Sequence, residues 1–219
     1  MIGVLALQGG VREHVQMLES LGARVLLVKN AAQLAQINGI VLPGGESSAM
    51  DRILRRFKMR DALIERLQEI PVLGTCAGLI MLAKGVINPA PGQETLKILD
   101  IDVRRNAFGP QRDSAVEQID TIYGTVQAAF IRAPEIVRIG AGSANAHTQY
   151  QQYRNFAHAE NPPASSESLL TSPENPDLRP IAYIDGRIVG VISPQAIGIS
   201  FHPELTGDTT IHEEFLQLI

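Results

Sequence analysis

The stretch PVLGTCAGLIMLAKG, residues 71–85, decides the fold. It begins with a short apolar run, passes through a cysteine between two glycines, Gly74 and Gly78, and continues in helix-forming residues. A strand, a tight glycine-flanked turn and a helix follow one another in the same way in the nucleophile elbow of serine hydrolases. The sequence therefore predicts a strand at 71–74 and a helix that begins at Cys76.

The segments before this stretch alternate between strand-like and helix-like patterns. Strand-like runs at 2–7, 24–29 (expected to be buried) and 39–45 alternate with helical patterns at 11–22, 50–57 and 60–67. Gly22 is a predicted C-cap, and Ser48 with Asp51 a predicted capping box. Such alternation predicts a parallel sheet covered on both faces, with ligands beyond the carboxyl ends of its strands. The turns after Leu7, Leu42 and Leu73 should then share one edge.

The second half of the chain has a different character. Strand-like runs occupy 96–108, 128–134, 179–192 and 196–204, and Asp185-Gly186 predicts a hairpin turn. Residues 143–177 are rich in Ser, Asn, Gln, His and Pro, which indicates a polar surface excursion. No repeat or linker divides the sequence, so we expect one domain over residues 1–219.

Composition excludes several classes of protein. Acidic residues outnumber basic ones, 23 to 19, which argues against a general nucleic-acid binder. No apolar run reaches the length that crosses a bilayer, and we see no secretory leader. A single cysteine cannot form an intrachain disulfide, which fits a reducing cytoplasm. We therefore expect a cytoplasmic protein with neither a membrane nor a nucleic-acid partner.

Two interpretations of Cys76 follow from its residue type alone. A lone cysteine in an apolar setting is by default a small core residue. At a strand-to-helix turn, however, the free N–H groups and the dipole of the helix favour a thiolate nucleophile. The catalytic interpretation needs a base elsewhere in the chain.

The segment SFHPEL, residues 200–205, offers such a base. His202 and Glu204 are two residues apart, and on an extended segment both would point to one face. A carboxylate beside an imidazole fixes its tautomer and stabilises its protonated form. The alternatives are a surface His-Pro-Glu turn and a zinc deaminase motif, but the Pro-Cys-x-x-Cys half of that motif is missing.

Other motifs carry less information. LPGGESS, residues 42–48, lacks the lysine of a phosphate-binding loop, and GAGSAN, 140–145, lacks the third glycine of a dinucleotide fingerprint. The backbone N–H groups near Gly45 and Ala77 are better candidates for an oxyanion hole. The remaining histidines show no metal-ligand spacing and are expected to be surface or structural residues: His14, His147, His158 and His212.

Together these motifs resemble the class I glutamine amidotransferases, and more closely the glutaminase subunits of pyridoxal 5′-phosphate synthase. The resemblance covers most of the chain outside 143–177, and its specific motifs are GVLALQGGVREH, LPGGESSAMDR, GTCAGLIMLAK, VRRNAFGPQRDS, FIRAP and SFHPEL. It implies a three-layer α/β/α, flavodoxin-like fold with a mostly parallel sheet and an added antiparallel portion.

The resemblance also implies roles for individual residues. Cys76 would be the nucleophile, with His202 and Glu204 completing the triad. The glutamine pocket would comprise Gly44, Gly45, Glu46, Arg105, Ile131 and Arg132, without metal or cofactor. Arginine can grip the substrate carboxylate and glutamate can attract its ammonium group. The sequence departs from the family pattern at Pro110 and Ala115, and its segment 143–177 is unusually long.

The resemblance implies hydrolysis of L-glutamine, with ammonia passed to a separate (β/α)₈-barrel synthase subunit in a large heteromeric complex. Gln8 and residues 11–14 resemble the part of the family that meets that subunit. Three alternatives remain open from the residues: a glutaminase of another biosynthetic pathway, a Cys-His-Glu γ-glutamyl hydrolase or peptidase, and a non-catalytic binding subunit.

Overall fold

The computed structural model describes residues 1–108, 114–140 and 177–219 of the chain. Apart from its last residue, the predicted polar excursion at 143–177 lies outside this part, as does Pro110.

A parallel sheet forms one half of the molecule, and its strands are short apolar runs whose side chains are largely buried. In spatial order these strands are β2 (Val25–Val28), β1 (Ile2–Leu5), β3 (Gly39–Leu42), β4 (Val72–Thr75) and β12 (Ala196–Ile199). Every neighbouring pair among them is parallel. This is the order of a flavodoxin-like sheet, in which ligands bind beyond the carboxyl ends of the strands.

The sheet continues as an antiparallel extension beyond β12, which confirms the added antiparallel portion. Next in order come β11 (Arg187–Ser193), β10 (Arg179–Ile184), β7 (Ser114–Thr121) and β8 (Gly124–Ile131). A branch from β11 carries β9 (Glu135–Ile139), β6 (Leu99–Arg104) and β5 (Ala83–Ile87). Asp185 and Gly186 both have positive φ, 46° and 77°, as the predicted tight hairpin between β10 and β11 requires.

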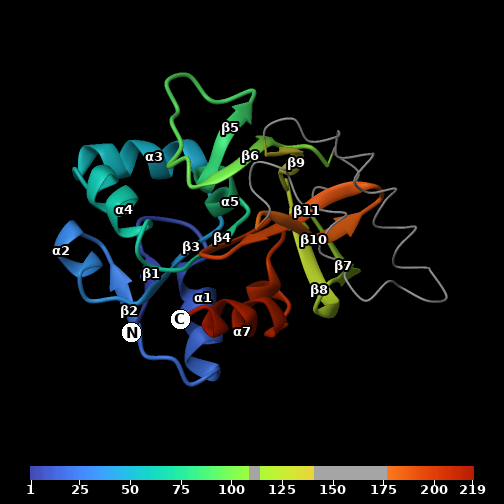
Figure 1. Ribbon diagram of the computed structural model, residues 1–219, viewed down its shortest axis with the longest axis horizontal. Helices are drawn as coiled ribbons and strands as arrows, with labels where there is room; N and C mark the ends of the chain where they lie inside the picture. Colours follow the sequence, from blue (N-terminus) through green and yellow to red (C-terminus); the bar gives the residue numbers. More distant parts are fainter. Residues whose placement is uncertain (109–113, 141–176) are drawn as a thin grey trace.

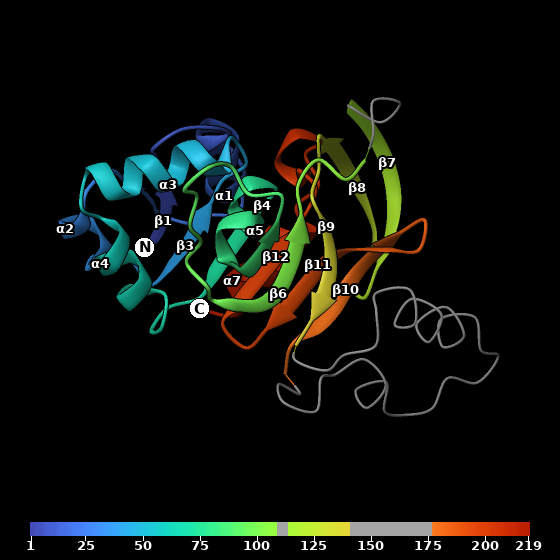
Figure 2. The ribbon, with the colours of Figure 1, turned by 90° about the horizontal axis from the view of Figure 1, so that it is seen from above.

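Helices cover both faces of the parallel sheet, so the predicted three layers are present (Figures 1 and 2). One face packs against α1 (Val11–Ser20) and α7 (Thr210–Gln217), whose Leu18, Ile211 and Phe215 share an apolar core with strand residues. The other face packs against α2 (Ala31–Leu34), α3 (Ser47–Arg56), α4 (Arg60–Arg66) and α5 (Ala77–Leu82). The three layers arise because each parallel strand is apolar on both faces.

Three local expectations were wrong. Strand β2 is an edge strand rather than a buried one, and its Leu27 is 38% exposed. Helix α3 begins at Ser47 and is capped by Glu46, whose side chain accepts from the Ser48 N–H, so Ser48 and Asp51 form no capping box. Helix α5 ends after Leu82, because residues 83–87 pair with β6 as a strand.

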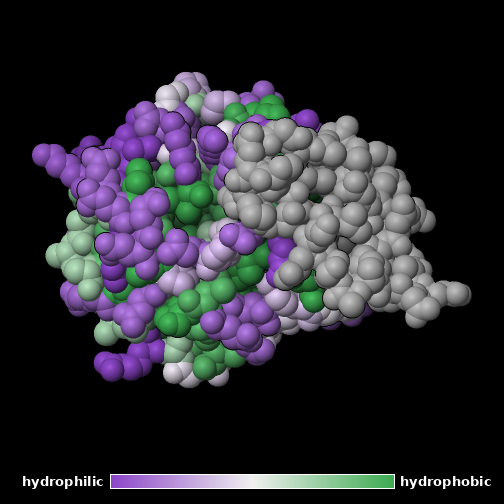
Figure 3. All heavy atoms as spheres, viewed as in Figure 1, coloured by the Kyte–Doolittle hydropathy of each residue, from purple (hydrophilic) through white to green (hydrophobic). Residues whose placement is uncertain are grey.

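The face seen in Figure 3 is mainly hydrophilic over α3 and α4, with smaller apolar areas between the polar side chains. No helix in the described ranges combines the length and apolar character that crossing a lipid bilayer requires.

Candidate active site

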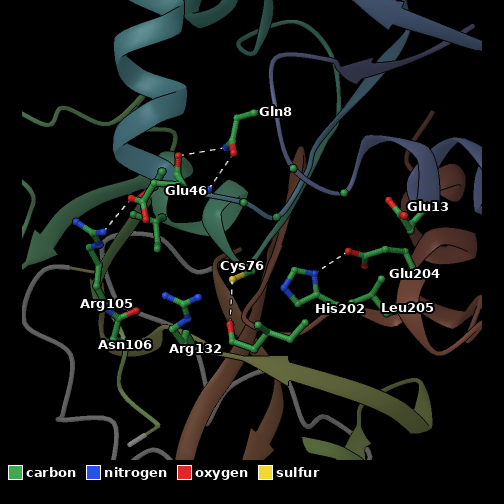
Figure 4. A pocket seen from close by; sticks show the side chains of 17 residues that line it. Gln8, Glu13, Glu46, Cys76, Arg105, Asn106, Arg132, His202, Glu204 and Leu205 are labelled. Carbon is green, nitrogen blue, oxygen red and sulfur yellow. Dashed lines mark hydrogen bonds and ion pairs between the residues drawn. The ribbon is translucent and has the colours of Figure 1, made fainter. Parts of the chain in front are cut away.

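A cavity of about 600 Å³ opens at the carboxyl edge of the parallel sheet (Figure 4). The segments that follow β1, β3, β4 and β12 all contribute residues to its wall. The turns after Leu7, Leu42 and Leu73 therefore share one edge, as the sequence predicted. With the exception of Ala77, every predicted site residue lines it: Gly44, Gly45, Glu46, Cys76, Arg105, Ile131, Arg132, His202 and Glu204.

Cys76 occupies the turn between β4 and α5 in a strained backbone conformation. Its φ of 48° and ψ of −99° are unfavourable for any residue with a side chain, and such strain is typical of a nucleophile elbow. The Cys76 N–H donates to the Ile199 carbonyl at 2.8 Å, which ties the turn to β12. Cys76 is 7% exposed, and its thiol lies 3.9 Å from the Ile131 carbonyl oxygen.

Gly78 lets the elbow approach the sheet closely. A Cβ at this position would lie 2.0 Å from the Leu42 carbonyl oxygen of β3, a distance that only glycine avoids. Gly78 therefore sets the distance between α5 and the sheet, and this distance sets the position of the Cys76 thiol.

His202 and Glu204 meet through their side chains, with 2.7 Å between Nδ1 and Oε1. The imidazole of His202 lies between the Cys76 thiol and the Glu204 carboxylate in Figure 4. The expected extended backbone is wrong, however, because Pro203–Leu205 forms a 3-10 turn for which His202 is the N-cap. In that turn the Glu204 side chain folds back onto the His202 ring. The two side chains therefore meet although the backbone between them is not extended.

The electrostatics of the pair favour an ion pair between imidazolium and carboxylate. Burial alone would lower the pKa of His202, but hydrogen bonding and charge interactions with Cys76 and Glu204 raise it to about 10. Burial alone would raise the pKa of Glu204, but hydrogen bonds from His14 and His202 and the charge of His202 hold it well below its usual range. His202 can therefore stay protonated in the folded protein.

The glycine turn after β3 packs against the imidazole. The Gly44 carbonyl accepts from the Gly10 N–H at 3.1 Å, which fixes one side of the Gly44–Gly45 peptide. Gln8 holds Glu46, the residue after Gly45, at both of its backbone groups. The Gln8 side-chain amide accepts from the Glu46 N–H at 3.2 Å and donates to the Glu46 carbonyl at 3.1 Å. The position of Gly45, a predicted oxyanion donor, is thus set from both sides.

Charged groups occupy the opposite wall of the cavity. Arg105 lies 3.0 Å from the Glu46 carboxylate and donates to the Gln93 side-chain oxygen at 3.1 Å. Gln93 in turn donates to the Ser47 hydroxyl at 2.9 Å. Burial tends to raise the pKa of Glu46, but hydrogen bonds from Ser48 and the nearby Arg105 lower it overall. A cation and an anion are thus available for the two charged ends of an amino acid.

Sequence reasoning missed several residues that shape the site. Gln93 positions Arg105 but belongs to no motif that we recognised, so no signal marked it. Asn106 and Leu205 line the cavity and could have been found, since both lie next to predicted site residues.

His14 and His212 are fully buried, so the surface alternative for them was wrong, whereas His147 and His158 lie outside the described residues. The described part of the chain contains no group of His, Cys, Asp and Glu that could hold a metal ion.

Comparison with protein families identifies the chain. The model of the SNO glutamine amidotransferase family matches residues 4–158. The chain belongs to this family. Its relatives include the pyridoxal 5′-phosphate synthase subunit PdxT of Kineococcus radiotolerans, 42% identical over all of this chain and 94% of that protein. The PdxT of Pyrococcus furiosus is 39% identical over all of this chain and 98% of that protein.

Solved structures support the same family and fold. A crystal structure of a glutamine amidotransferase superposes with a TM-score of 0.78 at 31% identity, covering 99% of this chain and 97% of that one. PurLQS from Thermotoga maritima superposes with a TM-score of 0.57 at 15% identity, covering 100% of this chain and 95% of that one, and shares the fold alone. The predicted fold class, and the resemblance that implied it, are confirmed.

Proposed function

We propose that this family member is the glutaminase subunit of a pyridoxal 5′-phosphate synthase. It hydrolyses L-glutamine to L-glutamate and ammonia and delivers the ammonia to a synthase partner. The observation that carries this proposal is the convergence of Cys76, His202 and Glu204 in one cavity whose opposite wall bears Glu46 and Arg105. Full-length identity to PdxT proteins supports the choice of pathway.

Arg105 and Glu46 orient the substrate. The Arg105 guanidinium binds the α-carboxylate of glutamine, and Glu46 attracts its ammonium group, while Ile131 and Arg132 form the side of the pocket nearest the thiol. Because Arg105 and Glu46 already pair with each other, the incoming zwitterion replaces one internal ion pair with two new ones. The side-chain amide then reaches the strained elbow.

Cys76 carries out the covalent step. Its thiolate attacks the amide carbon, and the backbone N–H groups of Gly45 and Ala77 stabilise the oxyanion. Protonated His202 gives its proton to the amide nitrogen, the C–N bond breaks, and ammonia leaves a glutamyl thioester. His202 then takes a proton from water, the hydroxide attacks the thioester carbon, and the C–S bond breaks to release glutamate and the thiolate. Glu204 stabilises the imidazolium whenever His202 is protonated.

The partner completes the function, because ammonia released into neutral water is mostly protonated and no longer nucleophilic. We propose that the partner is a (β/α)₈-barrel synthase subunit in a large heteromeric complex, which the chain meets through Gln8 and the start of α1. We also propose that the chain works as a single glutaminase domain, in keeping with the continuous sheet formed by the described strands. We propose that it works in the cytoplasm.

The test is glutamate release by the wild type and by Cys76→Ala, each with and without a purified pyridoxal 5′-phosphate synthase subunit. We expect turnover that depends on the synthase and is lost in Cys76→Ala, while the variant still binds the synthase. Activation by the synthase subunit of another pathway instead would contradict the choice of pathway. Faster cleavage of γ-glutamyl peptides without any partner would indicate a γ-glutamyl hydrolase. Absence of any covalent adduct with a glutamine-analogue alkylator would indicate a non-catalytic subunit.

A further inference from the structure

Three buried polar residues lie beneath the triad without lining the cavity. His14 comes from α1, Thr75 from the end of β4 and His212 from α7, and none of the three is exposed to solvent. They join the helix layer of α1 and α7 to the sheet at the point where the sheet carries the nucleophile. Burying three polar side chains together costs free energy unless they bind one another, so their contacts require an explanation.

His14 is the centre of this group. Its Nε2 lies 3.3 Å from Oε1 of Glu204 and 3.1 Å from Oγ1 of Thr75. Its Nδ1 lies 2.9 Å from Nε2 of His212. One imidazole thus contacts both the triad carboxylate and the residue directly before Cys76.

The hydrogen-bonding capacities of these groups fix the direction of the contacts. An ionised carboxylate can only accept, so Nε2 of His14 carries the proton, which lies between Oγ1 of Thr75 at 3.1 Å and Oε1 of Glu204 at 3.3 Å. In a neutral His14 ring Nδ1 is then an acceptor, and His212 donates to it from Nε2. Nδ1 of His212 has no partner among the described residues, as suits a nitrogen without a proton. Burial lowers the pKa of His212 to about 3, which keeps that ring neutral.

Glu204 depends on these donors because few others reach it. Its Oε1 lies near His202 and His14, whereas its buried Oε2 has no hydrogen-bond partner in the described part of the chain. If His14 were absent, His202 alone would hold the carboxylate, and the carboxylate could turn away from the imidazole. A buried anion with one donor is also less stable than one with two.

We propose that His14 is a positioning residue, which holds the Glu204 carboxylate against His202 and ties it through Thr75 to the strand that carries Cys76. His212 supports it by fixing the tautomer of the His14 ring. The proposal rests on the proposed glutaminase function. It assigns His14 no contact with glutamine, so its effect should fall on turnover rather than on substrate binding.

Three substitutions at His14 separate positioning from packing. His14→Leu removes the donor. In His14→Gln the amide nitrogen takes the place of Nε2 and can still donate to Glu204. In His14→Asn the amide nitrogen takes the place of Nδ1 and falls short of Glu204. Phe215→Leu, a buried apolar change on the neighbouring helix α7, is the control for lost packing.

We expect His14→Leu to lower kcat for synthase-activated glutamine hydrolysis by about 10- to 100-fold, with KM changed less than about twofold. His14→Gln should recover most of kcat, His14→Asn should not, and Phe215→Leu should retain the wild-type kcat. Thermal unfolding of each variant, followed by circular dichroism, reports lost packing separately. If His14→Leu does not fold, the comparison of kcat between His14→Gln and His14→Asn still tests the proposal.

The proposal is overturned if His14→Leu keeps the wild-type kcat, if Gln and Asn behave alike, or if Phe215→Leu reproduces the loss. A wild type without glutaminase activity in the presence of the synthase would instead contradict the proposed function. That result is visible before any variant is compared.

Discussion

Gly44 lies directly against the imidazole of His202: a Cβ built on this glycine would stand 2.2 Å from Cε1 of the ring. The turn after β3 and the histidine after β12 therefore fit together only because position 44 has no side chain. The contact sets the height of the ring above the sheet.

Gly44→Ala should displace His202 and disrupt its alignment with Cys76. We expect kcat for glutamine hydrolysis to fall by about 100-fold, because misplacing a catalytic group by about 1 Å has an effect of that size. Steady-state glutamate release with the synthase present measures this effect. Gly10→Ala is the glycine control in the same cavity: its Cβ would come no nearer than 3.6 Å to Oε1 of Glu204, an ordinary contact, so it should keep more of the activity than Gly44→Ala.

Arg105→Lys should weaken glutamine binding, because lysine cannot form the two parallel hydrogen bonds with which a guanidinium holds a carboxylate. We expect KM to rise by about tenfold or more, which corresponds to about 1.4 kcal/mol of lost binding. Arg104→Lys provides the neighbouring control, since Arg104 pairs with Glu135 and does not line the cavity. Equal KM values for the two variants would contradict the assigned role of Arg105.

The pKa shifts of the His202–Glu204 pair predict how stability depends on pH. The folded-state pKa of His202, about 10, is above its ordinary value of 6.5, so its contribution to stability is complete below pH 6.5. This contribution is lost as pH rises towards 10, by at most on the order of 1 kcal/mol for each pH unit. The pKa of Glu204 is lowered, so its contribution is present above pH 4.5 and declines only as the solution becomes strongly acidic.

Urea unfolding between pH 6 and 9.5 tests this loss of stability at alkaline pH. Circular dichroism follows the unfolding, because the chain has no tryptophan. In Glu204→Gln one of the two partners that raise the pKa of His202 is gone, so the decline should still begin near pH 6.5 but end at a lower pH, with a smaller total loss of stability. A wild-type stability that does not change over this range would contradict the raised pKa.

Gly78→Ala should destabilise the fold, because its Cβ would lie 2.0 Å from the Leu42 carbonyl oxygen, a backbone atom that cannot move aside easily. Overpacking of this kind costs about 1–3 kcal/mol in free energy of unfolding. Urea unfolding at neutral pH measures it. For comparison, Gly10→Ala should change the free energy of unfolding by less than about 1 kcal/mol. An unchanged stability for Gly78→Ala would mean that α5 can shift away from β3.

Local patterns in the sequence were sufficient for most, but not all, of the parallel half of the fold. Apolar runs alternating with amphipathic segments predicted β1, α1, β3, α3, α4 and β4, because burial on a strand or on one helix face has a fixed period. The Asp185-Gly186 hairpin followed from residue types that tolerate positive φ. The strands β7 and β9 and the helices α2 and α7 were not predicted. The partners of β9, which are β6 and β11, are distant in sequence. Strand β7 pairs with the adjacent β8, so distance in sequence does not account for that omission.

The sequence by itself also determined which chemistry is possible: one cysteine at a glycine-flanked turn, and a histidine with a carboxylate two residues later. Only the tertiary structure decided how these groups meet. The 3-10 turn at 203–205, rather than an extended strand, brings Glu204 onto His202, and residues from α1, β4 and α7 converge beneath them. Long-range packing sets such contacts, and residues as far apart as His14 and Glu204 leave no mark of it in local sequence.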